Sequence, residues 1–426
     1  MIYTNNRMNR IYADARSIID RAIAANLPGA AVRKTLKNRR FSGRISALAI
    51  GKAAWTMAEA AREELGDRIE RGIVITKYGH SQGSIPGMEI IEAGHPVSDE
   101  ASVRGAEKAL ALAESLGAGD ELLFLVSGGG SALFEKPLDG LSLVGIADIN
   151  GRLLSSGADI VEINTIRKRL SAVKGGRFAL ACAPARIFTV ILSDVLGDRP
   201  DSIASGPAAA DASTAEEALG VVKKYRLNLS GPMLECLARE TPKRLDNVET
   251  EIIGSVRSLC AAAAAAAGEL GYAPQILCDS MNGEAREAGL LMAAIARQIR
   301  GETDPAGFNP RRPCAIILGG ETVVRLKGGG KGGRNQELAL AAAEGIAGIP
   351  NLAIFSVGSD GTDGPTDAAG GIVDGSTLAA LAARGLKLQD ILDQNDAYNG
   401  LKAVNGLVMT GPTGTNVNDF AVILAR

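Results

Sequence analysis

An aliphatic run, a glycine-rich polar loop and a helical pattern follow one another repeatedly along this chain of 426 residues. The aliphatic runs that pass into such loops cover residues 45–50, 121–126, 187–192, 314–318 and 351–357. Alternation of this kind predicts an α/β fold with mostly parallel sheets covered by helices. Polar loops then gather at the carboxyl ends of the strands, which is where open α/β sheets bind ligands.

The length predicts two domains, because a single core rarely grows to this size. The most polar stretch without a strand pattern lies at residues 238–247, and domain boundaries fall in exposed polar segments. We therefore expect an N-terminal Rossmann-like α/β domain over residues 1–242 and a C-terminal α/β domain over residues 243–426. The last strands could be shared between the two.

Composition argues against several classes of partner. A formal net charge of −2 provides no field to attract nucleic acid or acidic membranes, and no apolar run reaches the length that spans a bilayer. The five cysteines are widely spaced and lie mostly in apolar runs, which is typical of reduced packing residues. The first residues lack the apolar core of a secretion signal, so we expect a cytoplasmic protein with no nucleic-acid or membrane partner.

A segment rich in glycine and basic residues, 327–337, lies where an extended stretch turns into a helix. Its five glycines would let the backbone approach a ligand, and the helix that follows adds the positive end of its dipole. Lys331 and Arg334 add full charges. The pattern predicts a site for phosphate or carboxylate, with a solvated glycine-rich hairpin as the alternative interpretation.

Two more strand ends carry features of anion sites. One is a run of three glycines between two serines, which forms a concave nest of N–H groups: Ser127, Gly128, Gly129, Gly130 and Ser131. The other is Lys52, which starts a helix, where the dipole disfavours a cation unless a ligand compensates. The alternatives are a tight turn without a ligand and an ordinary surface lysine.

Carboxylates follow two other predicted strands. The loop over residues 358–367 contains Asp360 and Asp363, and such hard oxygen donors suit magnesium, although aspartate–glycine loops are also ordinary turns. Asp194 lies in a second loop of this kind. Because the chain has only two histidines, a serine–histidine triad or a multi-histidine metal site is disfavoured.

Two nucleotide-binding patterns separate the remaining functions. The chain has no P-loop, but its glycines at 328, 330 and 333 match the dinucleotide fingerprint. That match keeps an NAD(P)-dependent reductase as an alternative. Cations inside the fingerprint and a carboxylate-rich loop beyond it fit phosphoryl transfer better.

Six motifs taken in chain order resemble those of class II glycerate kinases, the bacterial glycerate 2-kinases with a MOFRL domain. They lie at residues 127–133, 164–168, 174–176, 332–338, 360–367 and 411–416. The resemblance implies two α/β domains facing each other across a deep cleft, with ATP and magnesium, and phosphorylation of D-glycerate to 2-phosphoglycerate. Because some members are named hydroxypyruvate reductase, NAD(P)H-dependent reduction of hydroxypyruvate stays the alternative.

The resemblance also suggests roles for individual residues. Lys52 and Arg334 match the proposed catalytic cations, and Asp194 and Asp360 match carboxylates of the cleft. We expect Asp194 to orient the acceptor hydroxyl, Asp360 with Asp363 to hold magnesium, and Lys174 with the triple-glycine nest to hold anionic oxygens. The remaining predicted binding residues are Gly332, Gly333, Asn335, Glu337, Thr413 and Asn416. A homodimer is one expected arrangement, and a binding protein without turnover is the third hypothesis.

Overall fold

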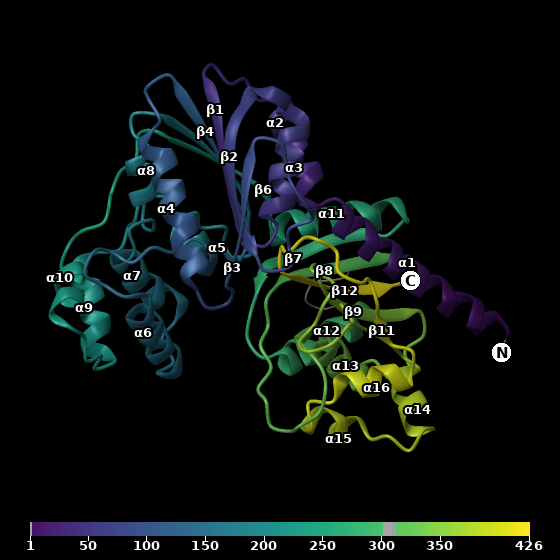
Figure 1. The fold of residues 1–426 in the computed structure, drawn as a ribbon. Helices are drawn as coiled ribbons and strands as arrows, with labels where there is room; N and C mark the ends of the chain where they lie inside the picture. The colour runs from purple at the N-terminus through teal and green to yellow at the C-terminus, as the bar shows by residue number, and fades with distance from the viewer. Residues whose placement is uncertain (1, 301–309, 311) are drawn as a thin grey trace. The chain divides into compact units, whose positions relative to one another are not determined.

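The computed structural model describes residues 2–300, 310 and 312–426, and the chain divides into two compact units. Unit 1 comprises Met1–Leu27 and Gly254–Arg426, and unit 2 comprises Pro28–Ile253. Each unit is built on its own six-stranded sheet with helices packed against it (Figure 1). The predicted two-domain α/β class is therefore confirmed.

The sheet of unit 2 has the strand order β3-β2-β1-β4-β5-β6. Its strands are β1 (Arg44–Ile50), β2 (Ile69–Lys77), β3 (Met88–Ala93), β4 (Asp120–Val126), β5 (Arg186–Leu192) and β6 (Val248–Gly254). The pairs β2–β3, β1–β2, β1–β4 and β4–β5 are all parallel. The strand order reverses between β1 and β4, and in open α/β sheets ligands bind at the carboxyl ends of two such strands.

Helices cover both faces of this sheet (Figure 1). On one face α3 (Ala54–Leu65) packs on β1 and β2, and α2 (Pro28–Lys37) packs on α3. On the other face, α4 (Glu100–Glu114) and α8 (Arg177–Ala181) share a core with alternate strand residues. The rings of Phe124 and Phe178 in that core lie 5.3 Å apart. Burial on both faces explains why β4 is apolar from Leu122 to Val126.

A second, helical core in unit 2 is formed by four helices. They are α6 (Leu143–Ser155), α7 (Ile160–Leu170), α9 (Ala215–Lys224) and α10 (Gly231–Leu237). The local sequence sets where three of them begin: Ser142 caps α6, and Asp159 and Thr214 form capping boxes at α7 and α9. Helices α6 and α7 belong to the connection from β4 to β5, which starts at the short helix α5 (Gly130–Leu133).

The sheet of unit 1 has the order β11-β10-β9-β12-β8-β7 and is mixed. Its strands are β7 (Ala273–Met281), β8 (Cys314–Gly320), β9 (Leu352–Gly358), β10 (Gly370–Asp374), β11 (Leu407–Val408) and β12 (Asp419–Ala425). Only the pair β7–β8 is parallel among these described strands. The expectation of a mostly parallel sheet therefore describes unit 2 better, because in unit 1 the last strand, β12, enters between β8 and β9 antiparallel to both.

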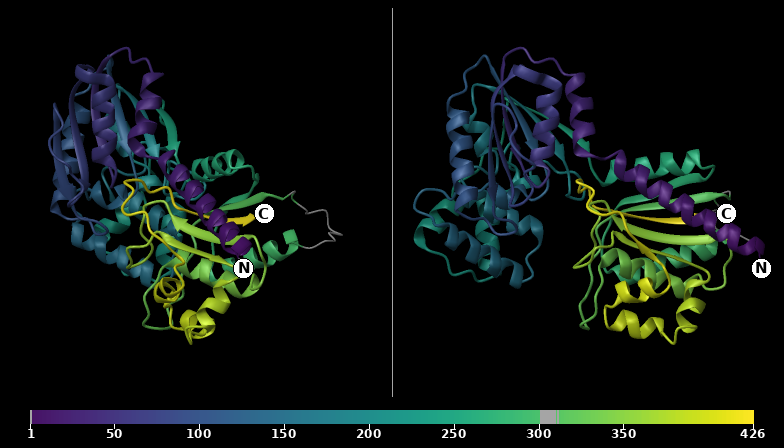
Figure 2. Two further views of the ribbon diagram at one scale, coloured as in Figure 1. Left: turned by 90° about the vertical axis from the view of Figure 1, so that its right-hand side faces the viewer. Right: turned by 45° about the vertical axis from the view of Figure 1, so that its right-hand side comes forward.

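Helices also cover both faces of the unit 1 sheet (Figure 2). One face carries α1 (Ile2–Ala24) and α11 (Val256–Glu269). The other carries α12 (Ala285–Arg300), α13 (Arg334–Gly345), α14 (Thr377–Ala382), α15 (Leu388–Asp393) and α16 (Ala397–Ala403). Among the described helices, none combines the length and the hydropathy that crossing a membrane requires.

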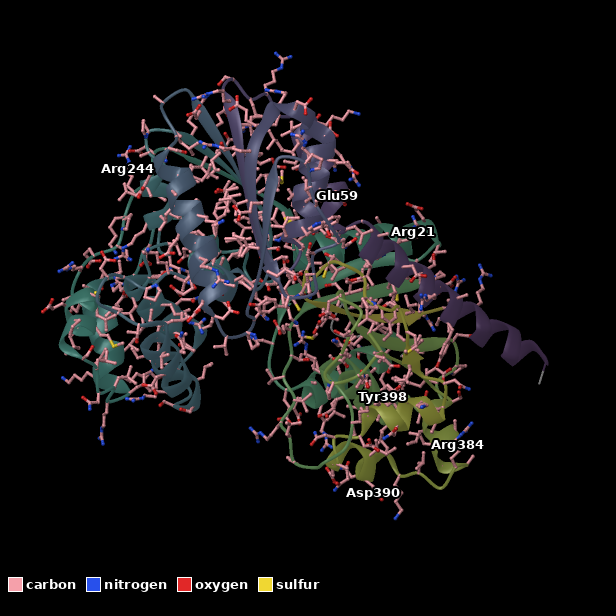
Figure 3. The ribbon with its side chains drawn as sticks, viewed as in Figure 1. Arg21, Glu59, Arg244, Arg384, Asp390 and Tyr398 are labelled. Atoms are coloured by element: carbon pink, nitrogen blue, oxygen red, sulfur yellow. The ribbon has the colours of Figure 1, made fainter. Side chains whose placement is uncertain are left out.

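The N-terminal helix belongs to the unit that contains the C-terminal part of the chain. Arg21 of α1, labelled in Figure 3, pairs with Glu269 of α11. Asp14 accepts hydrogen bonds from the Tyr272 hydroxyl (2.8 Å) and from the guanidinium of Arg426. The sequence-based division at 242/243 thus differs from the structural one, in which β6 stays with unit 2 and residues 1–27 join unit 1.

Candidate functional site

The carboxyl ends of β1, β4 and β5 bring several predicted site residues of unit 2 together. The backbone N–H of Lys52 donates to the carbonyl of Gly128 over 2.8 Å. A Cβ added at Gly129 would lie 3.2 Å from Lys52 Cγ, and one added at Gly128 would lie 2.0 Å from Asp194 Oδ2. Side chains at 128 or 129 would therefore displace the predicted functional groups, which explains two glycines of the nest.

The two serines of the nest hold loops together. Ser127 Oγ accepts from the N–H of Ala53 (3.1 Å) and lies 3.3 Å from the carbonyl oxygen of Ile50, so it joins the loops after β1 and β4. Ser131 Oγ lies 3.1 Å from Ser205 Oγ. Ser127 is buried and serves the loop itself, whereas Ser131 is partly exposed. At Gly130 a Cβ would lie 2.7 Å from the Ala204 side chain, so this glycine is required by packing.

Lys174 does not have the predicted role of holding an anion. Its side chain is 0% exposed, and its Nζ donates to the carbonyl of Phe134 (3.0 Å) and to the carboxylate of Glu135. Burial lowers the pKa of Lys174, and the charge of Glu135 opposes this shift. The side chain of Lys174 is instead engaged inside unit 2, where it pairs with Glu135.

A cavity of about 480 Å³ opens beside the nest, within unit 2. One part of its wall contains His95, Gly129 and Asp194, and another part contains side chains of α6 and α7. The polar groups among the latter and their neighbours are Ser131, Glu135, Asn150, Asn164 and Arg167. Burial lowers the pKa of His95, and the charge of Lys52 adds to this effect, so the imidazole is neutral at neutral pH. The volume falls in the range of roughly 300–1,000 Å³ that is typical of small-molecule sites.

In unit 1, Arg334 is the first residue of α13 and is held by two carboxylates. Its Nε and Nη2 donate to Asp419 over 2.6 and 3.2 Å, and its Nη1 lies 2.8 Å from Glu321. Burial raises the pKa of Asp419 to about 6, against the opposing effect of Arg334, and the charge of Asp363 adds to the rise. The arginine is thus paired before any ligand arrives.

Sequence reasoning did not assign Asp419 and Glu321 to the site. Glu321 follows β8, whereas Asp419 begins β12 and pairs in register with Gly320 and Gly358. Because β12 is antiparallel to its neighbours, its amino end lies beside their carboxyl ends. The search for polar residues at strand carboxyl ends therefore missed it.

Asp363 caps α13, so the predicted metal role is not supported for this residue. Its Oδ1 accepts from the N–H of Asn335 (3.1 Å), and its Oδ2 accepts from the N–H of Gln336 (2.8 Å). The residue is 3% exposed, and burial raises its pKa even though these N–H groups act to lower it. The predicted anion at this helix terminus is present, but it is a carboxylate of the protein.

The neighbouring predicted binding residues are also engaged internally. Asn335 accepts from the Ser356 hydroxyl over 2.6 Å, and Glu337 accepts from Asn395 Nδ2 over 3.1 Å. Both Asn335 and Glu337 are buried. At Gly333 a Cβ would lie 2.3 Å from the carboxylate carbon of Asp363. The contacts of these residues therefore support α13.

The glycine-rich loop before α13 packs on the segment between α15 and α16. Added Cβ atoms at Gly328 and Gly330 would lie 2.4 Å and 2.5 Å from backbone atoms of Gln394. At Gly332 the corresponding distance to Ala397 is 3.3 Å. Lys331 places its Nζ 4.3 Å from the ring centre of Tyr398, the residue labelled on α16 in Figure 3. Close packing of the backbone therefore accounts for these glycines without a ligand.

Asp360 keeps one carboxylate oxygen open. Its Oδ1 accepts from the N–H and the hydroxyl of Thr362 over 3.0 and 3.2 Å, whereas its Oδ2 has no partner among the described residues. The N–H of Thr413 donates to the Asp360 carbonyl over 3.2 Å, and Asn416 accepts from the N–H of Asn418 in the same loop. The predicted loops over 358–367 and 411–416 thus lie side by side.

The fit to magnesium rests on this one oxygen. Within the described ranges, no group of three or more histidine, cysteine, aspartate or glutamate side chains is placed to hold a metal. Magnesium is usually bound through one or two carboxylates, with water and phosphate completing its shell. Asp360 by itself would supply the one carboxylate that such a site needs from the protein.

Known proteins and family models match this chain over most of its length. Residues 14–238 match a family model described as a domain of unknown function, DUF4147, and residues 314–419 match the MOFRL family. The D-glycerate 2-kinase of Thermotoga maritima is 50% identical over 96% of this chain and 97% of its own. The glycerate 2-kinase of Pyrococcus horikoshii is 40% identical over 91% of this chain and 89% of its own. A crystal structure of the Thermotoga maritima glycerate kinase superposes with a TM-score of 0.94, covering 98% of this chain and 100% of that one.

Proposed function

Because this chain belongs to the glycerate 2-kinase family with a MOFRL domain, we propose that it transfers the γ-phosphoryl group of ATP to the 2-hydroxyl of D-glycerate. The products are 2-phosphoglycerate and ADP. The observation that carries the proposal is the group at the carboxyl ends of β1, β4 and β5, where Lys52 and Asp194 flank Gly128 and Gly129.

Phosphoryl transfer needs fixed positive charge more than covalent chemistry. Lys52 meets this need, since its Nζ forms no ion pair or hydrogen bond in the part of the chain that the structure describes. The strand order of unit 2 is the Rossmann-like order 3-2-1-4-5-6, which binds nucleotides where the order reverses, between β1 and β4. Both features support ATP as the phosphoryl donor at this edge.

Asp194 is our candidate for orienting the acceptor hydroxyl and accepting its proton late in the transfer. Its carboxylate lies against Gly128, on the wall of the cavity that also contains Gly129. The adjacent His95 imidazole is kept neutral by burial and by the charge of Lys52. A neutral imidazole can also accept a proton, so we assign this role to Asp194 on its place against the triple-glycine nest.

Arg334 and Asp360 are the candidates from unit 1. We assign Arg334 to the stabilisation of negative charge on the moving phosphoryl group. Asp360 would hold magnesium through Oδ2, and the ion, when bound, neutralises charge on phosphate oxygens. We leave Asp363 and Lys174 out of these roles, because Asp363 caps α13 and Lys174 is paired with Glu135.

A coupled assay tests the function. ADP should appear only when ATP, magnesium and D-glycerate are all present, and the phosphorylated product should be 2-phosphoglycerate. A parallel assay with NADH or NADPH and hydroxypyruvate tests the reductase alternative. Oxidation of the nicotinamide without glycerate-dependent ADP would replace the kinase proposal, and ligand binding without either reaction would make the chain a binding protein.

A further inference from the structure

Arg167 presents a guanidinium with two unused nitrogens to the cavity of unit 2. It lies on α7, and its Nε donates to Asn150 Oδ1 over 2.9 Å. Its terminal nitrogens form no hydrogen bond or ion pair within residues 2–300, 310 and 312–426. Burial lowers the pKa of Arg167, and the charge of Glu135 opposes this shift. A fixed, partly buried guanidinium fork of this kind fits a planar anion.

Glu135 lines the same cavity and has an unused acceptor oxygen. It is 3% exposed, and its Oε2 is paired with Lys174. Its Oε1 is buried and has no hydrogen-bond partner among the described groups. Leaving a buried charged oxygen without a donor is unfavourable. A ligand that brings a hydroxyl group would remove this cost.

Asn164 lies one turn before Arg167 on α7 and lines the same cavity. Its Oδ1 accepts from the Ser205 hydroxyl over 3.0 Å, which fixes the orientation of the amide. Its Nδ2 then has two donors, and neither is used by a described residue. The cavity therefore combines open donors for an anion with one open acceptor.

We propose that Arg167, Asn164 and Glu135 bind the acceptor acid, with its carboxylate on Arg167 and Asn164 and one of its hydroxyls donating to Glu135. This inference rests on the proposed kinase function and extends it to the recognition of a short hydroxy acid. A phosphate group carries more negative charge than a carboxylate at neutral pH, so the Glu135 carboxylate would repel it more strongly. A hydroxy acid satisfies both sets of groups.

The location also fits the reaction. The cavity that contains Arg167 and Glu135 is lined further along by Gly129 and Asp194. An acid anchored at Arg167 is thus held in the same cavity as the carboxylate proposed to orient its reacting hydroxyl. Arg167 and Glu135 determine which acid binds, and they act on the substrate directly.

Steady-state kinetics of Arg167→Gln test the anion contact. We expect the KM for D-glycerate to rise by about 10- to 100-fold, as for the loss of charged hydrogen bonds, while the KM for ATP stays within about twofold. Arg152→Gln is the matched control, because Arg152 lies on α6 and pairs with Asp148 at the surface. An unchanged KM for D-glycerate would overturn the inference, and so would an equal rise in the KM for ATP.

The acceptor contact needs a variant that does not leave Lys174 unpaired in the core. Replacing both residues, Glu135→Met with Lys174→Met, substitutes apolar groups of similar length for the buried pair. The wild type should prefer D-glycerate to D-lactate, which lacks the 3-hydroxyl, by about tenfold or more. The double variant should lose that preference, and its persistence would remove Glu135 from the proposal.

Calorimetric titration of D-glycerate into the full chain without nucleotide separates the two hypotheses. Binding to the wild type that weakens at least about tenfold in Arg167→Gln, with both proteins unfolding at similar temperatures, supports the site whatever the turnover. Equal binding by both proteins contradicts it. Failure of the wild type to form ADP would instead contradict the kinase function and leave the binding result standing.

Discussion

Arg167 in unit 2 and Arg334 in unit 1 are both partly buried arginines, but they are prepared for function in opposite ways. Arg167 has two terminal nitrogens without a described partner, whereas all three nitrogens of Arg334 are engaged by Asp419 and Glu321. Although burial acts to lower it, the pKa of Arg334 is raised by Asp419. The unpaired guanidinium of Arg167 suits recognition of a substrate, whereas the paired guanidinium of Arg334 is held in one position.

The same contrast runs through the surroundings of the two arginines. In unit 2, Glu135 Oε1 and the Asn164 Nδ2 group have no hydrogen-bond partner among the described residues. In unit 1 the helix terminus that follows the glycine-rich loop is already filled by Asp363. An anion that approaches Arg334 must therefore share the guanidinium with carboxylates, which favours charge that develops only in a transition state.

Truncating Lys52 or Arg334 should have the largest effect on turnover. We expect Lys52→Ala and Arg334→Ala each to lower kcat by on the order of a thousandfold, as for cations that stabilise a transferring phosphoryl group. A double-mutant cycle then measures the coupling: a combined loss far smaller than the product of the single losses would show that both cations act on one transition state. Lys108→Ala, which affects only a surface pair with Glu89, is the control. Losses that simply multiply would show that the two cations act independently.

Gly128→Ala tests the proposed place of Asp194 with a single methyl group. The new Cβ would lie 2.0 Å from Asp194 Oδ2, so the carboxylate must move. A displacement of this size should lower kcat by about a hundredfold while the protein stays folded. Gly220→Ala on α9 is the matched control, because its Cβ would meet nothing within 4 Å. Full activity in Gly128→Ala would remove Asp194 from the mechanism.

Asp360→Asn tests the one open carboxylate oxygen of unit 1. An amide is a poorer ligand for a hard cation, so the magnesium concentration that gives half-maximal activity should rise by about tenfold or more. Asp363→Asn serves as the contrast: it should lower the unfolding temperature, because Asp363 caps α13, with little change in the magnesium titration. The reverse pattern would return the metal role to Asp363.

The pH dependence of activity should reveal the carboxylate that holds Arg334. The pKa of Asp419 is about 6, so kcat should fall as the pH drops through 6 and Arg334 loses this charged partner. Asp419→Asn should show the lower activity throughout and lose the step near pH 6. Asp246→Asn, which affects an exposed pair with Arg244, should keep it.

The stability of the fold should also depend on Asp419, but it should fall as the pH rises, whereas activity falls as the pH drops. A folded-state pKa above the usual aspartate value means that the folded protein binds this proton more tightly than the unfolded chain does. The resulting stabilisation is full below about pH 4 and is lost as the pH rises through 6. Denaturant unfolding of the wild type and of Asp419→Asn at pH 5 and pH 8 measures it, and an equal pH response in both would contradict the shifted pKa.

Sequence alone predicted the features that follow from local periodicity. The α/β class follows from the alternation of strands, glycine loops and helices. The meeting of Lys52, Gly128 and Asp194 follows because parallel strands present their carboxyl ends at one edge. These predictions need no knowledge of which distant residues pair.

The errors and omissions concern pairing between distant parts of the chain. Arg334 meets Asp419 across 85 positions, and nothing in either local sequence indicates that pair. Lys174 has the charge expected of a ligand-binding residue, but this charge is paired with Glu135, which lies 39 positions away in the sequence. The amino terminus of a helix after a glycine loop can bind an anion of a ligand or a carboxylate of the protein. The sequence could therefore not show that Asp363 occupies the amino terminus of α13. The sequence showed Arg167 only as part of a motif. Which of its nitrogens lack a partner depends on the tertiary structure, which the local sequence does not give.

Lys331→Ala should have the smallest effect and tests the comparison most sharply, because the sequence alone predicts a ligand contact at this position. In the structure Lys331 is exposed, and its Nζ stacks on the Tyr398 ring at 4.3 Å. Its backbone N–H donates to Asp396 over 2.9 Å, a contact that alanine keeps. We therefore expect a loss of about 0.5–1 kcal/mol in unfolding free energy from the exposed cation–π contact, with the KM for ATP and D-glycerate unchanged within about twofold. Tyr398→Leu should lose more stability, because it also removes the hydrogen bond from the Tyr398 hydroxyl to Asp367, and Lys331→Ala in that background should add little. A tenfold or larger rise in the KM for ATP in Lys331→Ala would instead show that the loop before α13 binds the nucleotide, and that unit 1 also holds an open cation.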